Sequence, residues 1–250
     1  MDKLLERIAR NTDPKSSFYI ALNEKSTRIR TEFRPIIELD CNKKYEMALV
    51  SLDTYNSIPN IDESNNNFKY SPDNGTTWFN VDIPEGCYEI EDINNQIQKI
   101  MKDNKHGAAV SVTANNNTLR TVLIIDERFK VDFTCAKSIR SVLGFNEQIY
   151  SEGYNESENI TNIMSVNSLI VTNDIVSGSY SNGKTKNIIY FFTVNVGPGY
   201  KINETPMNLI YLPIMLSTLS SMEATLTDQS GKLANLRGEE LSIRFHVREA

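Results

Sequence analysis

Ser221-Met-Glu-Ala-Thr-Leu-Thr227 and Leu241-Ser-Ile-Arg-Phe-His-Val247 decide the fold class of this chain. In both stretches apolar residues alternate with polar ones, and a period of two predicts a β-strand with one face on a core and one in water. Gly231 and Gly238 in the connection suit turn conformations with positive φ. We therefore expect the chain to end in an antiparallel β unit that forms part of its core.

The bulk composition indicates a folded protein without a membrane helix. The 250 residues are 40% hydrophobic and 23% charged, which is ordinary for a globular chain large enough to bury a core. No run of eighteen apolar residues occurs, so no membrane span is predicted, and the first ten residues do not resemble a secretory signal. A net charge of −6 disfavours non-specific nucleic-acid binding, and no specific nucleic-acid site is predicted.

An N-terminal arm is expected over residues 1–16. Leu4, Leu5 and Ile8 form one face of a short helix that ends before Pro14, and so short a helix is marginal alone. The arm is therefore expected to order only against another surface.

From residue 17 onward β-branched and aromatic residues predict strands. They are expected at 18–22, 29–39, 44–55, 68–71, 77–83, 109–114, 119–125, 129–133, 163–171, 175–180, 187–196 and 209–215. The 187–196 stretch is the most apolar of these and is expected to be central, whereas Pro213 places its strand at an edge or bulge.

A small helix-plus-strands unit is expected at about 84–145, set into the β chain. Ile90, Ile93, Ile97, Ile100 and Met101 have the spacing of one amphipathic helix, and a helical turn over 138–145 should stop at Gly144. The expected fold class is thus all-β: a sandwich or jelly roll over 17–250 with this inserted unit.

Residue patterns typical of catalysis or cofactor binding do not occur. His106 and His246 are expected to be exposed, and neither lies in a motif with a nucleophile and an orienting carboxylate. Cys41, Cys87 and Cys135 are too scattered for a disulfide framework or a zinc site, and phosphate-binding glycine motifs are absent. We predict no catalytic, cofactor-binding or metal residues, and no cofactor.

Two groups of residues admit a functional and a structural interpretation. Glu89 and Asp92 are either a catalytic acid–base pair or helix-capping residues, and capping is favoured because acids suit a helix start. The aromatic residues of the 68–83 hairpin are either a sugar platform or core packing, and packing is favoured; they are Tyr70, Trp78 and Phe79.

Four stretches resemble the minor capsid (penton) protein of Polinton, or Maverick, elements and related virophages and adintoviruses. They are Lys44–Asn60, Trp78–Asn94, the Leu143-Gly-Phe145 turn and Leu226–Val247. The resemblance spans residues 17–249. It implies a single jelly roll that forms homopentamers at the vertices of an icosahedral capsid, beside a double jelly-roll major capsid protein.

The resemblance also implies a location. The protein would be a structural, non-enzymatic part of the virion, synthesised and assembled inside the host cell. Residues 1–15 would face the capsid interior. Loops at 56–67, 151–162 and 197–207 would form the outer or inter-subunit rim.

Two alternatives from other classes remain open. A jelly-roll cell-attachment or carbohydrate-binding head would be trimeric and would bind glycans through loop aromatics such as Tyr154 and Tyr200. An unrecognised hydrolase would use carboxylates such as Glu89 and Asp92 and would lose activity on a single carboxylate change. Host, capsid size and receptor are not determined by the sequence.

Overall fold

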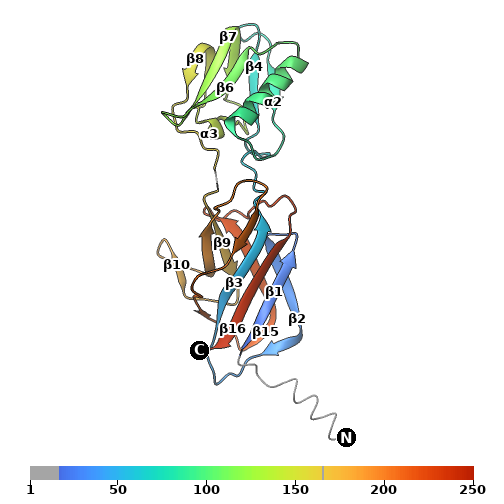
Figure 1. Cartoon of the computed structure of the whole chain (residues 1–250), viewed down its shortest axis with the longest axis vertical. Helices are drawn as coiled ribbons and strands as arrows, with labels where there is room; N and C mark the ends of the chain where they lie inside the picture. The colour runs from blue at the N-terminus through green and yellow to red at the C-terminus, as the bar shows by residue number, and fades with distance from the viewer. Residues whose placement is uncertain (1–16, 165) are drawn as a thin grey trace. The chain divides into compact units, whose positions relative to one another are not determined.

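Residues 17–164 and 166–250 are described by the computed structural model, and they divide into two compact units (Figure 1). We call residues 17–57 with 166–250 the sandwich unit, and Ile58–Ser165 the inserted unit. Each is described by itself. The predicted arm at 1–16 lies outside the described residues.

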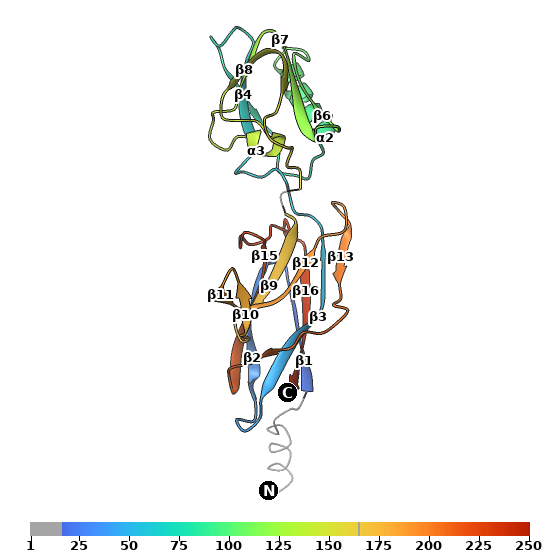
Figure 2. The same ribbon diagram turned by 90° about the vertical axis from the view of Figure 1, so that its left-hand side faces the viewer.

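The sandwich unit is a jelly roll of eight main strands in two antiparallel sheets, seen as two layers in Figure 2. The first sheet has the order β1 (Ser17–Glu24), β16 (Leu241–Glu249), β3 (Tyr45–Tyr55) and β13 (Lys201–Glu204). The second has the order β12 (Ile188–Thr193), β9 (Ser168–Asn173), β15 (Thr218–Asp228) and β2 (Arg28–Glu38).

The pairing within these sheets identifies the topology. Counted along the unit, the first strand pairs with the eighth, the second with the seventh, the third with the sixth and the fourth with the fifth. Such a nested set of antiparallel pairs is a long hairpin rolled into two sheets, which is the jelly roll. The predicted fold class is therefore confirmed.

The alternating apolar residues of the last two long strands are buried in the core, as predicted. Met222, Ala224 and Leu226 of β15 are fully buried, and so are the inward residues of β16; these are Leu241, Ile243, Phe245 and Val247. The expected pairing of the two strands is wrong, because β15 bonds to β2 and β9 while β16 bonds to β1 and β3. Their apolar faces meet across the sandwich instead.

Other predictions for this unit need correction. The apolar β12 is an edge strand and not central, and its Phe191 is 72% exposed. The segment after Tyr200, expected as loop, contains β13. Strand β9 begins only at Ser168, and 175–180 contributes only the start of a small hairpin. That hairpin joins β10 (Ser179–Ser181) to β11 (Lys184–Lys186) around the predicted turn at Asn182–Gly183.

Pro213 lies where its chemistry requires. Strand β14 (Leu212–Pro213) is two residues long and pairs with Met47 and Glu46 at the edge of β3. A proline has no N–H to donate, so it is tolerated at an edge and not inside a ladder. The edge prediction is confirmed.

The sandwich unit has two distinct ends. At one end β3 finishes at Tyr55 and β9 starts at Ser168, so both connections to the inserted unit leave from this end. At the other end Ser17 pairs with Arg248, and Glu249 pairs with Tyr45. The first described residue and the C-terminus therefore lie at the end away from the connections (Figure 1).

The inserted unit is a sheet with a helix packed on it. Its strand order is β5 (Phe79–Asp82), β4 (Asn67–Ser71), β7 (Arg120–Asp132) and β6 (Val110–Asn115), and β8 (Ile149–Glu156) also pairs with β7. Helix α2 (Ile90–Asp103) packs against β6 through the predicted stripe, of which Ile90, Ile93, Ile97 and Met101 are buried. Helix α3 (Arg140–Leu143) ends at Gly144 in the left-handed conformation, as predicted.

The unit is larger than the expected 84–145. Its core includes Ile61, Phe68 and Tyr70 before that range and Tyr150 after it. The predicted hairpin at 68–83 belongs here and forms one edge of the sheet. The two strands expected at 119–133 are one strand, β7, with a register shift between Ile125 and Lys130, and β8 was expected to be loop.

Candidate functional site

The two histidines are half-buried in aromatic clusters, so the prediction that they are exposed is wrong. In the inserted unit, His106 Nδ1 lies 2.8 Å from the Tyr70 hydroxyl, and its ring packs edge-on against Phe79 at 4.8 Å. Tyr70 is fully buried and stacks on Phe79. The interpretation of these hairpin aromatics as packing residues is therefore confirmed for Tyr70 and Phe79.

His246 lies on the outer face of the first sheet with both ring nitrogens bonded. Ser17 Oγ lies 2.7 Å from Nε2, and the Tyr211 hydroxyl lies 2.7 Å from Nδ1. The pair of Ser17 and His246 resembles a nucleophile and base, but a triad needs a carboxylate on Nδ1 to stabilise the imidazolium. A neutral phenol occupies that position, so the cluster lacks this part of a hydrolase site.

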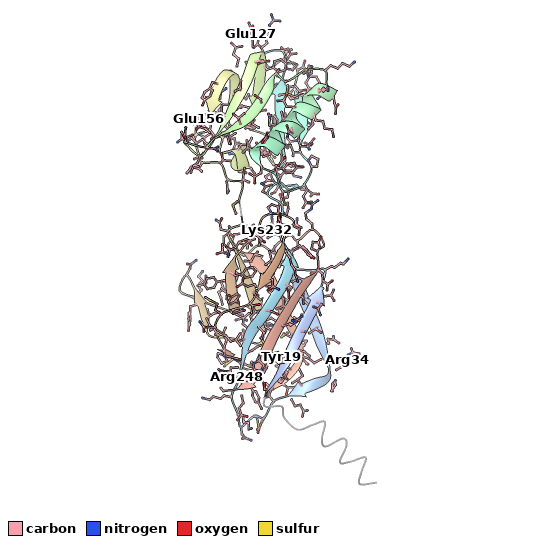
Figure 3. All side chains as sticks on the ribbon, viewed as in Figure 1. Tyr19, Arg34, Glu127, Glu156, Lys232 and Arg248 are labelled. Atoms are coloured by element: carbon pink, nitrogen blue, oxygen red, sulfur yellow. The ribbon has the colours of Figure 1, made fainter. Side chains whose placement is uncertain are left out.

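Further contacts make this cluster a structural clamp. The Tyr19 ring packs on His246 at 4.8 Å, and the Arg248 guanidinium lies 3.6 Å from the centre of the Tyr211 ring. Arg248 also donates to Glu46 at 2.6 Å. Tyr211 is thus held over β3 and β16, near the end of the unit where Tyr19 and Arg248 are labelled in Figure 3.

The carboxylates considered for hydrolysis form the cap of α2. Glu89 is the N-cap residue, its backbone N–H donates to Asp92 Oδ2 at 3.1 Å, and its own carboxylate accepts from the third residue of the helix. This reciprocal pair is a capping box. The capping interpretation is therefore confirmed.

The three cysteines lie at separate places, and none of them forms a disulfide within the described residues. Burial raises the pKa of Cys135, which disfavours the reactive thiolate. Among residues 17–164 and 166–250, no three side chains of His, Cys, Asp or Glu gather in a way that suits a metal ion. Over the same residues, no helix is long and apolar enough to cross a membrane.

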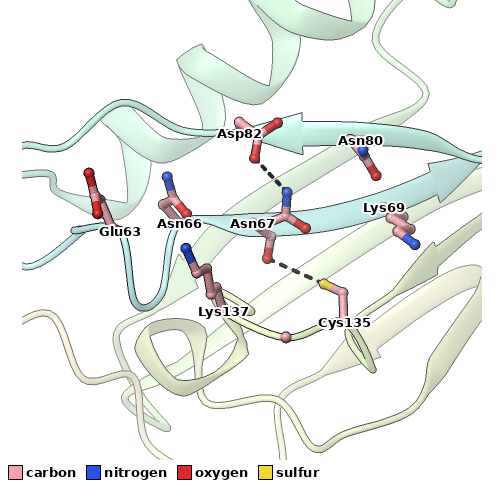
Figure 4. Close-up of a pocket in the computed structure, with 9 residues that line it drawn as sticks. Glu63, Asn66, Asn67, Lys69, Asn80, Asp82, Cys135 and Lys137 are labelled. Atoms are coloured by element: carbon pink, nitrogen blue, oxygen red, sulfur yellow. Dashed lines mark hydrogen bonds between the residues drawn. The ribbon is translucent and has the colours of Figure 1, made fainter.

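A polar hollow of about 400 Å³ opens on the inserted unit (Figure 4). Its lining is mostly polar and includes three amide and four charged side chains; the amides are Asn66, Asn67 and Asn80, and the charged residues are Glu63, Lys69, Asp82 and Lys137. Asn67 already donates to Asp82. None of its lining residues is aromatic, so the hollow lacks the stacking platform that the carbohydrate hypothesis requires.

The two aromatics named for glycan binding are both exposed. Tyr154 lies on β8 of the inserted unit and is 66% exposed, whereas Tyr200 precedes β13 of the sandwich unit. They belong to different units.

The most unusual surface is an exposed apolar segment between β13 and β15. We call Pro206–Leu216 the apolar ribbon; its sequence is Pro-Met-Asn-Leu-Ile-Tyr-Leu-Pro-Ile-Met-Leu. Surface loops are normally polar, and contiguous exposed apolar patches mark interaction sites. Five large side chains of the ribbon are exposed, namely Met207, Leu209, Ile210, Met215 and Leu216.

Charge is distributed unequally between the two units. The inserted unit has nine Lys and Arg against sixteen Asp and Glu, whereas the sandwich unit has thirteen of each. The whole acidic excess of the chain therefore belongs to the inserted unit, which includes the labelled Glu127 and Glu156 (Figure 3). Like charges repel, so net charge opposes the approach of an acidic surface to the inserted unit but not to the sandwich unit.

No protein-family model matches the chain, and no curated protein sequence matches it significantly. Among solved structures, it is similar to the mavirus penton protein. The TM-score is 0.50 at 11% sequence identity, over 94% of this chain and 100% of that chain. Domains D2–D3 of the flagellar cap protein FliD from Escherichia coli align with a TM-score of 0.24 at 13% identity, over 85% of this chain and 100% of that chain. The second likeness carries no argument.

The likeness to the mavirus penton protein shows a shared fold. It extends over nearly the whole of both chains, so it includes most of the jelly roll and of the inserted unit. It agrees with the fold that the sequence resemblance implied.

Sequence reasoning missed the apolar ribbon as a surface. Residues 209–215 were expected to form a strand at an edge or bulge, and no exposed apolar surface was predicted there. Only Leu212 and Pro213 pair as a strand, and the residues on either side are left exposed. The available signal was Pro206 at the start of the ribbon and Pro213 within it, because a proline has no N–H to donate to a regular ladder.

Proposed function

We propose that the chain is a minor capsid (penton) protein that forms homopentamers at the vertices of an icosahedral capsid of a Polinton-like DNA element or virus. The observation that carries the proposal is the single jelly roll with a fold shared by the mavirus penton protein over 94% of the chain. The residue motifs that resemble those of penton proteins support the same proposal, and they are independent of the fold comparison.

In this proposal the protein has a structural role in the virion and no enzymatic one. Its partners are four further copies of itself and a double jelly-roll major capsid protein. The clamp around His246 and the capping role of Glu89 and Asp92 support a structural role, because each gives a structural task to a residue type that is common in catalysis.

We infer an orientation within the capsid from the two ends of the sandwich unit. We place the end with Ser17 and the C-terminus toward the capsid interior, the side proposed for residues 1–15, and the end bearing the two connections outward. The acidic inserted unit would then lie on the solvent side, where its charge keeps neighbouring particles apart.

The mass of the purified full chain in solution, measured by light scattering after size exclusion, tests the proposal. We expect five times 28.4 kDa. A trimer would contradict a penton and support the carbohydrate-binding or attachment head. A chain that stays monomeric at concentrations of order 100 µM would contradict self-assembly of the pentamer.

A further inference from the structure

The apolar ribbon is held along one edge of the sandwich unit and is not a free loop. Leu212 and Pro213 pair with β3, and the Ile214 N–H donates to the Tyr45 carbonyl at 2.9 Å. The Tyr211 hydroxyl bonds to His246 at 2.7 Å. These contacts fix the middle of the ribbon, so its exposed side chains are presented from a defined backbone.

The exposed side chains are large and apolar, and little covers them. Met207 is 99% exposed, Met215 72% and Ile210 64%. The exposed fractions of these three residues, added to those of Leu209 and Leu216, equal about three fully exposed large side chains. At about 150 Å² for each such side chain, this is on the order of 500 Å² of apolar surface.

That area lies within the range of about 300–600 Å² for the largest apolar patch on a typical monomer, and such patches are often functional. A standard interface buries about 800 Å² on each side, and its centre is the most apolar part. The ribbon alone supplies more than half of one such side. Packing against a partner would remove this surface from water, which is favourable.

The charge distribution is compatible with a second copy of the chain as the occupant. The sandwich unit carries equal numbers of acidic and basic residues, so two copies meet there without net repulsion, whereas two inserted units with seven excess acids each repel. A ring further requires that the ribbon of one copy meets a different surface of the next copy, because ribbon against ribbon gives a two-fold dimer.

We propose that the apolar ribbon is the surface through which each copy packs on the sandwich unit of the next copy in the ring. This inference rests on the proposed function and goes further by assigning the contact to Pro206–Leu216. It places Met207, Ile210 and Met215 at the buried centre of the contact.

The chain contains its own probes for this contact. Met207 and Met215 lie in the ribbon, and Met164 of the inserted unit, at 70% exposed, matches Met215 at 72%. Met47, Met101 and Met222 are fully buried and report on folding. Peroxide converts exposed methionine to the sulfoxide at a rate that follows access. Mass spectrometry of peptides gives the rate at each site.

The experiment compares the full chain at low and high concentration while light scattering reports its mass. On assembly, oxidation of Met207 and Met215 should slow at least about five-fold while Met164 is unchanged. A pentamer in which Met207 and Met215 remain as reactive as Met164 would overturn this inference and leave the penton proposal standing. An assembly that is not a pentamer but protects both ribbon methionines would support the ribbon and overturn the penton. A chain that never assembles would overturn both.

A pair of variants gives an independent test. Met207→Ser with Ile210→Ser removes apolar surface from the ribbon, and Met164→Ser with Ile160→Ser removes exposed side chains of similar type from the inserted unit. All four residues are exposed, so folding should be retained, as checked by circular dichroism. The ribbon variant should need at least about ten times more protein to assemble, since it loses part of the central apolar contact. Equal assembly of the two variants would overturn the inference.

Discussion

Gly144→Ala should destabilise the inserted unit far more than Gly107→Ala does. Both glycines have positive φ, +83° and +66°, so each alanine meets the left-handed penalty of about 1 kcal/mol. A Cβ on Gly107 would meet no atom within 4 Å, whereas on Gly144 it would lie 2.4 Å from the Asn159 carbonyl oxygen. Only the second substitution requires the backbone to move.

The additional cost follows from the bonds that this movement breaks. The Gly144 carbonyl accepts from the Asn159 N–H at 2.9 Å and from its side-chain amide at 3.3 Å. Displacing Asn159 by about 1 Å weakens both bonds, at about 1 kcal/mol each. We expect a total of about 3 kcal/mol for Gly144→Ala and about 1 kcal/mol for Gly107→Ala.

Urea unfolding of the full chain, followed by tryptophan fluorescence, measures the difference. Trp78 is the only tryptophan and lies in the inserted unit, so its signal reports this unit. With an m-value of about 1.3 kcal/mol/M, the midpoint should fall by about 2 M for Gly144→Ala and by less than about 1 M for Gly107→Ala. Midpoints within about 0.3 M of each other would refute the reasoning about the close carbonyl.

Three further predictions test the core, the cap and a buried phenol. Phe245→Ala should cost the sandwich unit about 4 kcal/mol, because the side chain is fully buried, while the Trp78 transition stays within about 0.5 kcal/mol of wild type; a matching loss in the Trp78 transition would contradict two separate cores. Asp92→Ala should lower the free energy of unfolding of the inserted unit by about 1 kcal/mol through loss of the capping box, and an unchanged urea midpoint would count against the cap. Burial, followed by the hydrogen bond to Glu158, raises the pKa of Tyr150 from 10.0 to about 12. The folded unit therefore holds this proton more tightly than the unfolded chain, so the stabilisation is complete below pH 10 and is lost between pH 10 and 12. In Tyr150→Phe, the free energy of unfolding measured by the Trp78 transition should fall less between pH 10 and 12 than in wild type. An unaltered dependence on pH would contradict the assignment.

The sequence predicted elements whose burial follows one clear period. The alternation in β15 and β16, the stripe of α2 and the stop at Gly144 all appear in the structure. Each has one buried face, so its pattern is independent of which element packs against it.

The missed elements have weak or misleading patterns. In β8 only Tyr150 is buried, and in β13 only Ile202, so neither strand shows an alternation. In β12 an apolar residue on both faces predicted a central strand, but Phe191 points away from the core. The pairing of strands also cannot be predicted from a local pattern. Strands β15 and β16 follow each other in the sequence but belong to different sheets.

At the candidate site, too, the sequence predicted only those features that depend on neighbouring residues. The capping role of Glu89 and Asp92 could be predicted, because it depends on positions within one helix turn. The bond from Tyr211 to His246 joins residues 35 positions apart, and the exposure of the ribbon depends on how β14 meets β3. Such features arise from tertiary structure and not from local sequence.

Electron microscopy of the purified assembly tests the central claim most directly, because it counts the copies around the axis. We expect class averages with five sandwich units around a central axis. Averages with three-fold symmetry, or single particles of one copy at concentrations where the ribbon methionines are protected from oxidation, would contradict a penton.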